Sequence, residues 1–485
     1  MAADASLIKK TATEIHKLLK TEAVSPLDLL DALEARNAEV DGAVNALPTL
    51  CFDRARDHAK AVMEKPVDER GILAGMPVAI KDLSPVAGVR STWGSPIYKD
   101  FVPGRSDCMV EVLEANDALI YAKANTPEFG AGANTFNEVF GATVNPWDTS
   151  KSCAGSSGGS AVALATGQAW MATGSDLGGS LRNPASFCSI VGFRPSPGRV
   201  AAGASGPGAF PQDLLAIPGQ SFSVAGPMAR NVPDVALMLD AMVGSHRADG
   251  ISLPRARESY VDAVADRKLP RKVAFSRDLG VTPVHPEVAS ICEAAAKRFE
   301  ELGCIVEEAH PDFTDIQDIF QTHRAMSFYV GKKILLEKHR DLLKPEVIWN
   351  IERAAELTVD DFARVELARG RYLARAGAFF EEYDLLLSPA TIVPPYPVEQ
   401  RFVAELGDHK FDNYVEWLSI AYAITLTGFP AVSVPAGFTH DDLPVGMQLV
   451  GGPRGEADLL SAANMYEELT GYAGLVPMDP RVPKS

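Results

Sequence analysis

Short apolar runs alternate along this chain of 485 residues with stretches whose apolar positions recur every three or four residues. The runs are typical of buried strands, and the three-to-four spacing predicts helices. The predicted strands are 76–80, 118–122, 190–193, 273–275, 304–308, 383–388, 431–434 and 445–450. The predicted helices are 6–20, 25–40, 51–63, 110–118, 161–170, 232–243, 286–302, much of 315–380 and a last helix from about Asp458. Because no linker interrupts this alternation, we expect one large α/β domain.

Residues 1–65 differ from the rest because they carry helical spacing and no core-strand pattern. Within them, Ser25-Pro-Leu-Asp28 fits a capping box with proline at the first helical position. No linker rich in proline, glycine or serine follows. We therefore expect 1–65 to be a helical layer of the same domain.

Serine and glycine concentrate in two segments, Lys151-Ser-Cys-Ala-Gly-Ser-Ser-Gly-Gly-Ser160 and Gly174-Ser-Asp-Leu-Gly-Gly-Ser-Leu-Arg182. A flexible linker has such a composition, but the apolar, alanine-rich stretch 161–170 between them predicts a buried helix. Two small-residue loops that flank a helix can bring backbone N–H groups and hydroxyls to one point. The region is therefore a candidate active site.

Two kinds of site fit this region poorly. A phosphate-binding loop of the Walker A type needs Gly-x-x-x-x-Gly-Lys-[Ser/Thr], and that string is absent from the sequence. A nucleophile elbow matches Gly155-Ser-Ser-Gly-Gly159 with Ser157 at its centre, and a helix follows as required. An elbow is entered from a core strand, however, whereas 145–152 has the composition of turns and loops. The elbow stays a minority alternative.

A third kind of site uses two serines and a lysine. The sequence has no histidine between His58 and His246, so the base must be another residue. Lys81 follows the apolar run 76–80, where burial would lower its pKa and keep the amine neutral; the alternative is a solvated lysine at a strand end. Ser180 is the candidate nucleophile, because the glycines before it allow backbone N–H groups to approach an oxyanion. Ser156 would pass a proton between them.

These residues resemble the amidase signature family of Ser–cisSer–Lys hydrolases. The glycine- and serine-rich signature corresponds to Gly155–Ser160 and Gly174–Arg182, and the catalytic lysine motif to Val78-Ala-Ile-Lys-Asp82. Ser156 and Ser180 are 24 positions apart, which also agrees with the family. Further similar segments are Asn125–Phe129, Phe140–Trp147 and Val191–Pro195.

The resemblance implies a single amidase domain over 1–485, with a central twisted mixed β-sheet covered by helices on both faces. It makes 70–240 the signature core, and 241–485 the remainder of the sheet together with a helical region that forms the substrate pocket. It also implies a cis peptide bond between Gly155 and Ser156.

The same resemblance assigns roles to site residues. Lys81 is the base, Ser156 the proton shuttle and Ser180 the nucleophile that forms an acyl-enzyme. The remaining assignments are backbone N–H groups of Leu177, Gly178 and Gly179 as the oxyanion hole, Gly130 as a substrate-binding position, and Ser157, Asp176 and Arg182 as supporting residues. Phe, Leu and Tyr residues within 315–430 are candidates for the acyl pocket, with core packing as the alternative.

Three positions depart from the family pattern. Ala154 stands where the family often has glycine, which we expect to be tolerated unless the position needs a positive φ. Ser175 and Leu177 replace residues that are often threonine and a small or polar residue. We expect both to affect the pocket but not the three catalytic residues.

The charge and cysteine content narrow the class of protein. A net charge of −17 argues against nonspecific binding to nucleic acid or to an anionic membrane, since both need clustered Lys and Arg. The six cysteines are scattered, as in a protein with reduced thiols. The sequence shows neither a signal peptide nor a run of 18 apolar residues, so we expect a cytoplasmic protein without a membrane span.

We therefore expect an amidase that hydrolyses a small carboxamide or aryl amide to a carboxylate and ammonia or an amine. It needs neither a metal nor another cofactor, and the resemblance suggests a homodimer. One alternative is the A-type component of a glutamyl-tRNA(Gln) amidotransferase, which works within a complex. Another is a catalytically dead binding protein with the same fold, against which the complete set of Lys81, Ser156 and Ser180 argues.

Overall fold

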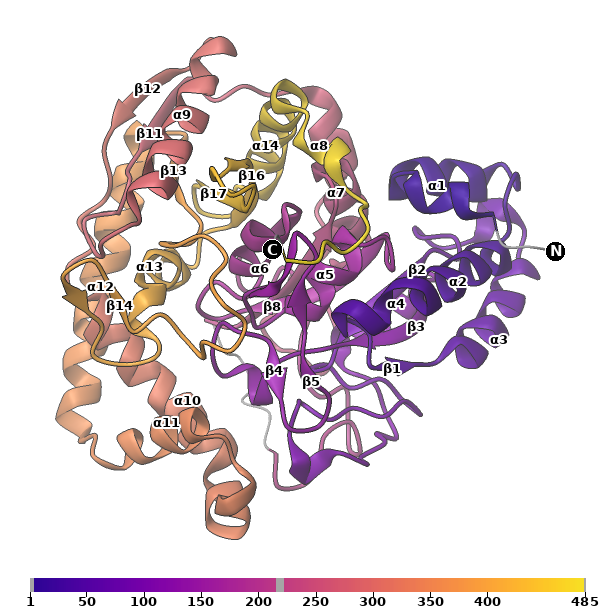
Figure 1. The fold of residues 1–485 in the computed structure, drawn as a ribbon, viewed down its shortest axis with the longest axis horizontal. Helices are drawn as coiled ribbons and strands as arrows, with labels where there is room; N and C mark the ends of the chain where they lie inside the picture. Colours follow the sequence, from indigo (N-terminus) through magenta and orange to yellow (C-terminus); the bar gives the residue numbers. More distant parts are fainter. Residues whose placement is uncertain (1–3, 215–221, 484–485) are drawn as a thin grey trace.

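An eleven-stranded sheet runs through the whole molecule (Figure 1). The computed structural model describes residues 4–214 and 222–483. The strand order is β1-β3-β2-β8-β10-β9-β16-β17-β13-β11-β12. These strands are β1 (Thr49–Leu50), β2 (Pro77–Lys81), β3 (Leu119–Ala124), β8 (Met171–Asp176), β9 (Val191–Arg194), β10 (Val224–Ala229), β11 (Lys272–Phe275), β12 (Ile305–Glu308), β13 (Leu385–Pro389), β16 (Ala431–Phe438) and β17 (Pro444–Gly451).

The sheet is mixed. β2 runs parallel to β3 and β8, and β11 runs parallel to β12 and β13, whereas the strands between β8 and β13 pair antiparallel. Three two-stranded sheets lie outside it, and their strands are β4 (Phe136–Asn137), β5 (Gly141–Ala142), β6 (Val144–Asn145), β7 (Asp148–Ser152), β14 (Glu405–Leu406) and β15 (His409–Lys410).

Helices cover both faces of the sheet, so the expected α/β fold is confirmed (Figure 1). They are α1 (Ala12–Lys20), α2 (Pro26–Val44), α3 (Phe52–Met63), α4 (Cys108–Ala115), α5 (Gly158–Ala165), α6 (Arg182–Cys188), α7 (Val232–Met242), α8 (Tyr260–Asp266), α9 (Pro286–Glu301), α10 (Ile316–His339), α11 (Pro345–Ala355), α12 (Val359–Glu382), α13 (Ser419–Thr427) and α14 (Glu456–Thr470). Within the described residues, none of these helices has the length and apolar content that crossing a membrane requires.

The capping box expected at Ser25 is confirmed. The Ser25 hydroxyl accepts a hydrogen bond from the Asp28 N–H, and the Asp28 carboxylate accepts one from the Ser25 N–H. Helices α1, α2 and α3 lie at the opposite side of the molecule from α10, α11 and α12 (Figure 1). Of these N-terminal helices, α3 packs against β3 and α2 against β2, whereas α1 packs against α7.

The polar ends of β2 and β8 lie at the same edge of the sheet, because the two strands are neighbours and parallel. β2 is buried along its whole length, as its apolar sequence predicts, and ends at Lys81. β8 ends at Asp176, directly before the loop that carries Ser180. The fold therefore brings the candidate base and the candidate nucleophile together from positions about a hundred residues apart.

The sequence analysis differs from the structure in two ways around β8. The helix predicted over 161–170 is present as α5, but it spans Gly158–Ala165 and ends earlier than expected. The start of the segment 174–182, expected to be a loop, belongs to a strand, β8, which begins at Met171. The strand was missed because Gly174 and Ser175 interrupt its apolar pattern. A side chain at Gly174 would come within 2.5 Å of Leu181 and 2.8 Å of the Ser157 hydroxyl, so the packing around the site excludes a larger residue there.

The segment 145–152 is also more regular than expected. β7 pairs with β6 in a small two-stranded sheet, and not with the main sheet. The nucleophile elbow centred on Ser157 therefore still lacks the core strand that such an elbow needs.

Helix α6 lies directly on β9, because Gly192 has no side chain. A Cβ atom at Gly192 would lie 2.2 Å from the Leu181 carbonyl oxygen and 2.9 Å from Ala185 Cβ. Leu181 follows Ser180, so this close approach helps to fix the position of the loop that carries the candidate nucleophile.

Replacing Gly192 with alanine should lower the free energy of unfolding by about 1–3 kcal/mol, because the backbone of α6 must move. Urea unfolding followed by tryptophan fluorescence measures the change. The control is Gly370→Ala in α12, where a Cβ meets no atom within 4 Å and alanine favours the helix. Equal stability of the Gly192→Ala variant and the parent would contradict the packing argument.

Candidate active site

Lys81 is buried and surrounded by hydroxyl groups. Lys81 is the last residue of β2, and it is only 1% exposed. The amine lies 2.7 Å from Ser156 Oγ, 2.9 Å from Ser157 Oγ and 3.0 Å from Ser175 Oγ. The alternative of a solvated lysine at the strand end is therefore wrong.

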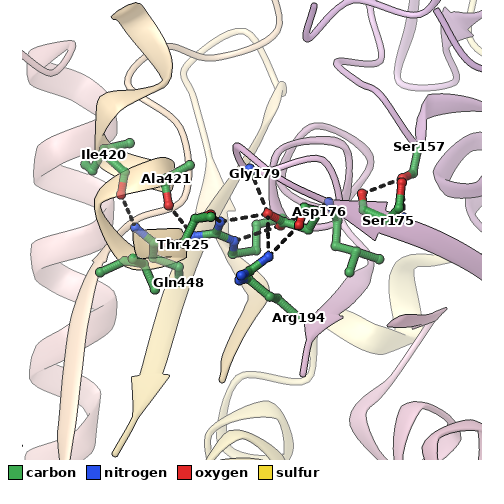
Figure 2. Close-up of polar contacts among 12 residues, drawn as sticks. Ser157, Ser175, Asp176, Gly179, Arg194, Ile420, Ala421, Thr425 and Gln448 are labelled. Atoms are coloured by element: carbon green, nitrogen blue, oxygen red, sulfur yellow. Dashed lines mark hydrogen bonds and ion pairs between the residues drawn. The ribbon is translucent and has the colours of Figure 1, made fainter. Parts of the chain in front are cut away.

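The environment of Lys81 favours the neutral amine. Burial lowers its pKa to about 7, although the negative charge of Asp176 acts in the opposite direction. A neutral amine has two N–H groups and one lone pair, which suits three hydroxyl neighbours. The Ser157 hydroxyl donates to the Ser175 carbonyl oxygen at 3.4 Å (Figure 2). It therefore accepts from the Lys81 amine. The lone pair is then free to take a proton from Ser156.

Ser175 has a larger part in this cluster than its sequence position suggested. We expected it to affect the pocket but not the catalytic residues, yet its hydroxyl contacts the Lys81 amine directly. The side chain also lines the cavity beside Ser156. The sequence could not show this contact, because it depends on the pairing of β2 with β8.

Ser156 and Gly130 face each other across a narrow gap. The Gly155–Ser156 peptide bond is cis, as the resemblance implies. Gly130 has φ +70°, and a Cβ atom there would lie 3.3 Å from Ser156 Oγ and 3.0 Å from Leu83 Cδ1. Glycine at position 130 therefore satisfies both the backbone angle and the space beside the hydroxyl.

Ser180 lies in the turn between β8 and α6 and lines the same cavity as Ser156. Its hydroxyl has no hydrogen-bond partner among residues 4–214 and 222–483. Leu177 and Gly178 also line this cavity. Gly179 was the third expected oxyanion donor. Its N–H donates to Asp176 Oδ1 at 2.9 Å and is therefore already engaged in a hydrogen bond.

Asp176 connects the loop of Ser180 to two arginines (Figure 2). Its carboxylate accepts hydrogen bonds from the N–H groups of Gly179 and Leu181 and two from the Arg182 guanidinium, both at 3.0 Å. Burial would raise the pKa of this carboxyl, but the positive charges of Arg182 and Arg194 hold it well below its usual range. Asp176 is thus a buried, paired anion that fixes the loop.

Arg182 extends the network to the other half of the chain. Its guanidinium donates to the carbonyl oxygen of Ala421 at 2.9 Å and to Gln448 Oε1 at 2.7 Å (Figure 2). Gln448 in turn donates to the Ile420 carbonyl oxygen. The loop of the nucleophile is therefore held to α13 and β17, which lie more than two hundred residues later in the sequence.

Ala154 occupies a backbone conformation that disfavours alanine. Its φ is +58°, in the left-handed region, so the condition under which we expected glycine to be needed is met. The Thr135 hydroxyl donates to the Ala154 carbonyl oxygen at 2.8 Å and helps to hold the turn before Ser156.

A cavity of about 220 Å³ joins these groups to the outside. One wall is a single face of α10, which lies within the region 315–380 that the sequence predicts to be mostly helical. The α10 residues in this wall recur with helical spacing and are Phe320, Arg324, Ser327, Phe328, Gly331 and Lys332. Phe320, Phe328 and Leu418 agree with the expectation that aromatic and leucine residues of 315–430 line a pocket.

Metal-ligating side chains do not gather in this structure. Among the described residues, His, Cys, Asp and Glu form no group of three or more that could hold a metal ion.

A model of the amidase family matches residues 28–460, which is most of the chain. This chain belongs to the amidase signature family. It is therefore an amidohydrolase, an enzyme that acts on carbon–nitrogen bonds.

Two relatives of this amidase illustrate the range of the family. The chain is 33% identical to an acylamidase of Rhodococcus erythropolis, over 97% of each protein. It is also 33% identical to the A-type component of the glutamyl-tRNA(Gln) amidotransferase of Moorella thermoacetica, over 95% of this chain and 97% of that protein. Among solved structures, a bacterial aryl acylamidase of the family superimposes with a TM-score of 0.87 at 27% identity, covering 97% of this chain and 99% of the other.

The φ of Ala154 gives a stability prediction for this amidase. Ala154→Gly and Ala161→Gly each remove one buried methyl group, but only the first relieves a left-handed alanine; Ala161 lies within α5. We expect Ala154→Gly to be more stable than Ala161→Gly by about 1–2 kcal/mol. Urea unfolding of the two variants gives the difference. A variant at position 154 that is no more stable than the one at 161 would contradict the argument.

Proposed function

We propose that this enzyme hydrolyses the C–N bond of a small carboxamide or aryl amide to a carboxylate and ammonia or an amine. The observation that carries the proposal is the contact of 2.7 Å between Ser156 Oγ and the buried amine of Lys81, whose pKa is lowered to about 7. A neutral lysine in contact with a hydroxyl can serve as a general base at neutral pH. Ser180, which lines the same cavity, is the proposed nucleophile.

The proposed reaction begins with proton transfer. Lys81 takes the proton of Ser156 as Ser156 takes that of Ser180, and Ser180 Oγ attacks the amide carbonyl carbon. The negative charge that develops on the carbonyl oxygen accepts hydrogen bonds from backbone N–H groups of Leu177 and Gly178. Gly179 contributes through its φ of +102° and its lack of a side chain rather than through its N–H, which is bound to Asp176.

Breakdown of the tetrahedral intermediate releases the amine. Ser156 donates a proton to the leaving nitrogen and regains one from Lys81, which leaves an acyl group on Ser180. Water then attacks the acyl carbon, and its proton passes through Ser156 to Lys81. The bond between the acyl carbon and Ser180 Oγ breaks, Lys81 returns the proton through Ser156 to Ser180, and the carboxylic acid leaves and ionises in solvent. Ser157 and Ser175 orient the Lys81 amine throughout, and Gly130 leaves room for the substrate beside Ser156.

The second candidate is the A-type component of a glutamyl-tRNA(Gln) amidotransferase, because the Moorella relative is as similar as the acylamidase. We favour the free amidase, which the high TM-score with the aryl acylamidase supports. Glutaminase activity that requires added partner proteins would reverse this choice. A homodimer and a cytoplasmic location remain predictions from the sequence.

Ser180→Ala should reduce kcat for amide hydrolysis by a factor on the order of 10⁴ or more, because the nucleophile is lost. It should also abolish covalent labelling by a serine-directed fluorophosphonate, located by mass spectrometry of the digested protein. Ser223→Ala is the control, since Ser223 lines the cavity but has no role in the proposed reaction. Labelling that persists in Ser180→Ala would contradict the assignment, and labelling at Ser157 would favour the elbow.

The pH profile should report the state of Lys81. Because burial lowers the pKa of Lys81 to about 7, the base is neutral above that pH and protonated below it. We expect kcat/KM to rise with pH through about 7 and then level off. The rising limb should be lost in Lys81→Ala together with most of the rate. A limb centred near 10, or one that is unchanged in Lys81→Ala, would remove Lys81 as the base.

A further inference from the structure

The α10 wall of the cavity carries two positive charges and no negative one. Arg324 and Lys332 line the cavity from α10, and none of its described lining residues is Asp or Glu. Residues 1–3, 215–221 and 484–485 contain no Asp or Glu either. This excess of positive charge belongs to a chain whose net charge is −17, so it is a local feature.

Arg324 is a buried cation without an ion-pair partner among the described residues. It is 7% exposed, and its guanidinium lies 4.8 Å from the ring centre of Phe328 and 5.7 Å from that of Tyr414. One nitrogen donates to the Tyr414 hydroxyl at 2.8 Å, while Nε is buried with no partner. A guanidinium has five N–H donors, so most of its hydrogen-bonding capacity is unused.

Lys332 lies two helical turns along the same face. Its amine is held over the rings of Phe328 at 4.6 Å and Phe129 at 5.4 Å. Glu128 is the carboxylate that acts on it, but the two oxygens of Glu128 already accept hydrogen bonds from the Ser95 hydroxyl and the Lys344 N–H. Burial and the charge of Arg324 lower the pKa of Lys332 to about 8, so the amine is still mainly protonated at pH 7.

A buried cation without a counter-charge, such as Arg324, is costly unless a bound anion completes it. The partly buried Lys332 shares its one nearby carboxylate, Glu128, with two other donors. The same cavity is also lined by the apolar side chains of Leu83, Phe320, Val415 and Leu418, beside the hydroxyls of Ser223 and Ser327. This arrangement suits a molecule with an apolar middle, an amide at one end and an anion at the other. The planar guanidinium matches a carboxylate with two parallel hydrogen bonds.

We propose that the substrate carries a carboxylate, bound by Arg324 and Lys332, in addition to the amide that Ser180 attacks. The inference rests on the proposed function, and it narrows the substrate to amides of negative charge. The carboxylate can belong to the acyl group, as in a monoamide of a dicarboxylic acid, or to the amine, as in an acylated amino acid. The two sources present the same chemistry to α10.

Matched pairs of substrates test the proposal. Glutaric acid monoanilide and its methyl ketone analogue, 5-oxohexananilide, place the charge on the acyl side. 4-Acetamidobenzoate and 4-acetamidoacetophenone place it on the amine side. We expect the anion of at least one pair to have a kcat/KM about tenfold or more above its ketone. The pair that shows the preference identifies the side.

Variants of α10 then locate the effect. Arg324→Gln and Lys332→Gln should each reduce the anion-to-ketone ratio about tenfold. The control is Lys333→Gln, which removes an exposed lysine beside Lys332 that pairs with Glu337, and should leave the ratio as it is. A ratio near one in the parent enzyme, or one that Arg324→Gln does not change, would overturn the proposal.

A binding measurement separates this inference from the proposed function. We would measure how far 4-phenylbutyrate and its neutral analogue, 5-phenylpentan-2-one, slow the labelling of Ser180 by a fluorophosphonate. Stronger protection by the anion, lost in Arg324→Gln, supports the carboxylate site even where no tested amide is hydrolysed. Equal protection by both overturns it, although amide hydrolysis by Ser180 would stand. Failure of Ser180 to react at all would instead contradict the proposed function.

Discussion

The site depends on keeping the Lys81 amine buried and therefore neutral. β2 provides the burial, because it is enclosed on both faces and both edges, and its apolar sequence ends at the lysine. An amine inside a protein still needs hydrogen-bond partners, and Ser156, Ser157 and Ser175 supply them without supplying a charge. A carboxylate in the place of any of these hydroxyls would stabilise the ammonium form and raise the pKa of the lysine.

Asp176 favours the charged form of Lys81, but Arg182 and Arg194 weaken this effect. Its negative charge raises the pKa of Lys81, but the same carboxylate is neutralised by Arg182 and Arg194. The carboxylate also binds the N–H of Gly179, so it shapes the loop of Ser180 as it balances the charge. Electrostatic balance and loop geometry are thus set by the same buried ion pair.

The sequence predicted the parts of the site that have a local pattern. The burial of Lys81 follows from the apolar run before it, and the serines were found through a long, specific resemblance. The strand β8 was missed because packing against Leu181 and Ser157 imposes glycine on a buried strand. The engaged N–H of Gly179, the contact of Ser175 with Lys81 and the positive φ of Ala154 depend on tertiary structure, which no local pattern records.

The orientation of the α10 wall could not be predicted from the sequence either. Arg324 and Lys332 lie about 150 residues after Ser180, and on a charged helix their spacing looks like that of any solvated face. Only the fold shows that this face turns inward, onto the cavity. The groups proposed for bond cleavage come from β2, β8 and their loops, whereas the wall comes from α10. Substitutions on α10 can therefore change which amides bind while the hydrogen bonds around Lys81 stay intact.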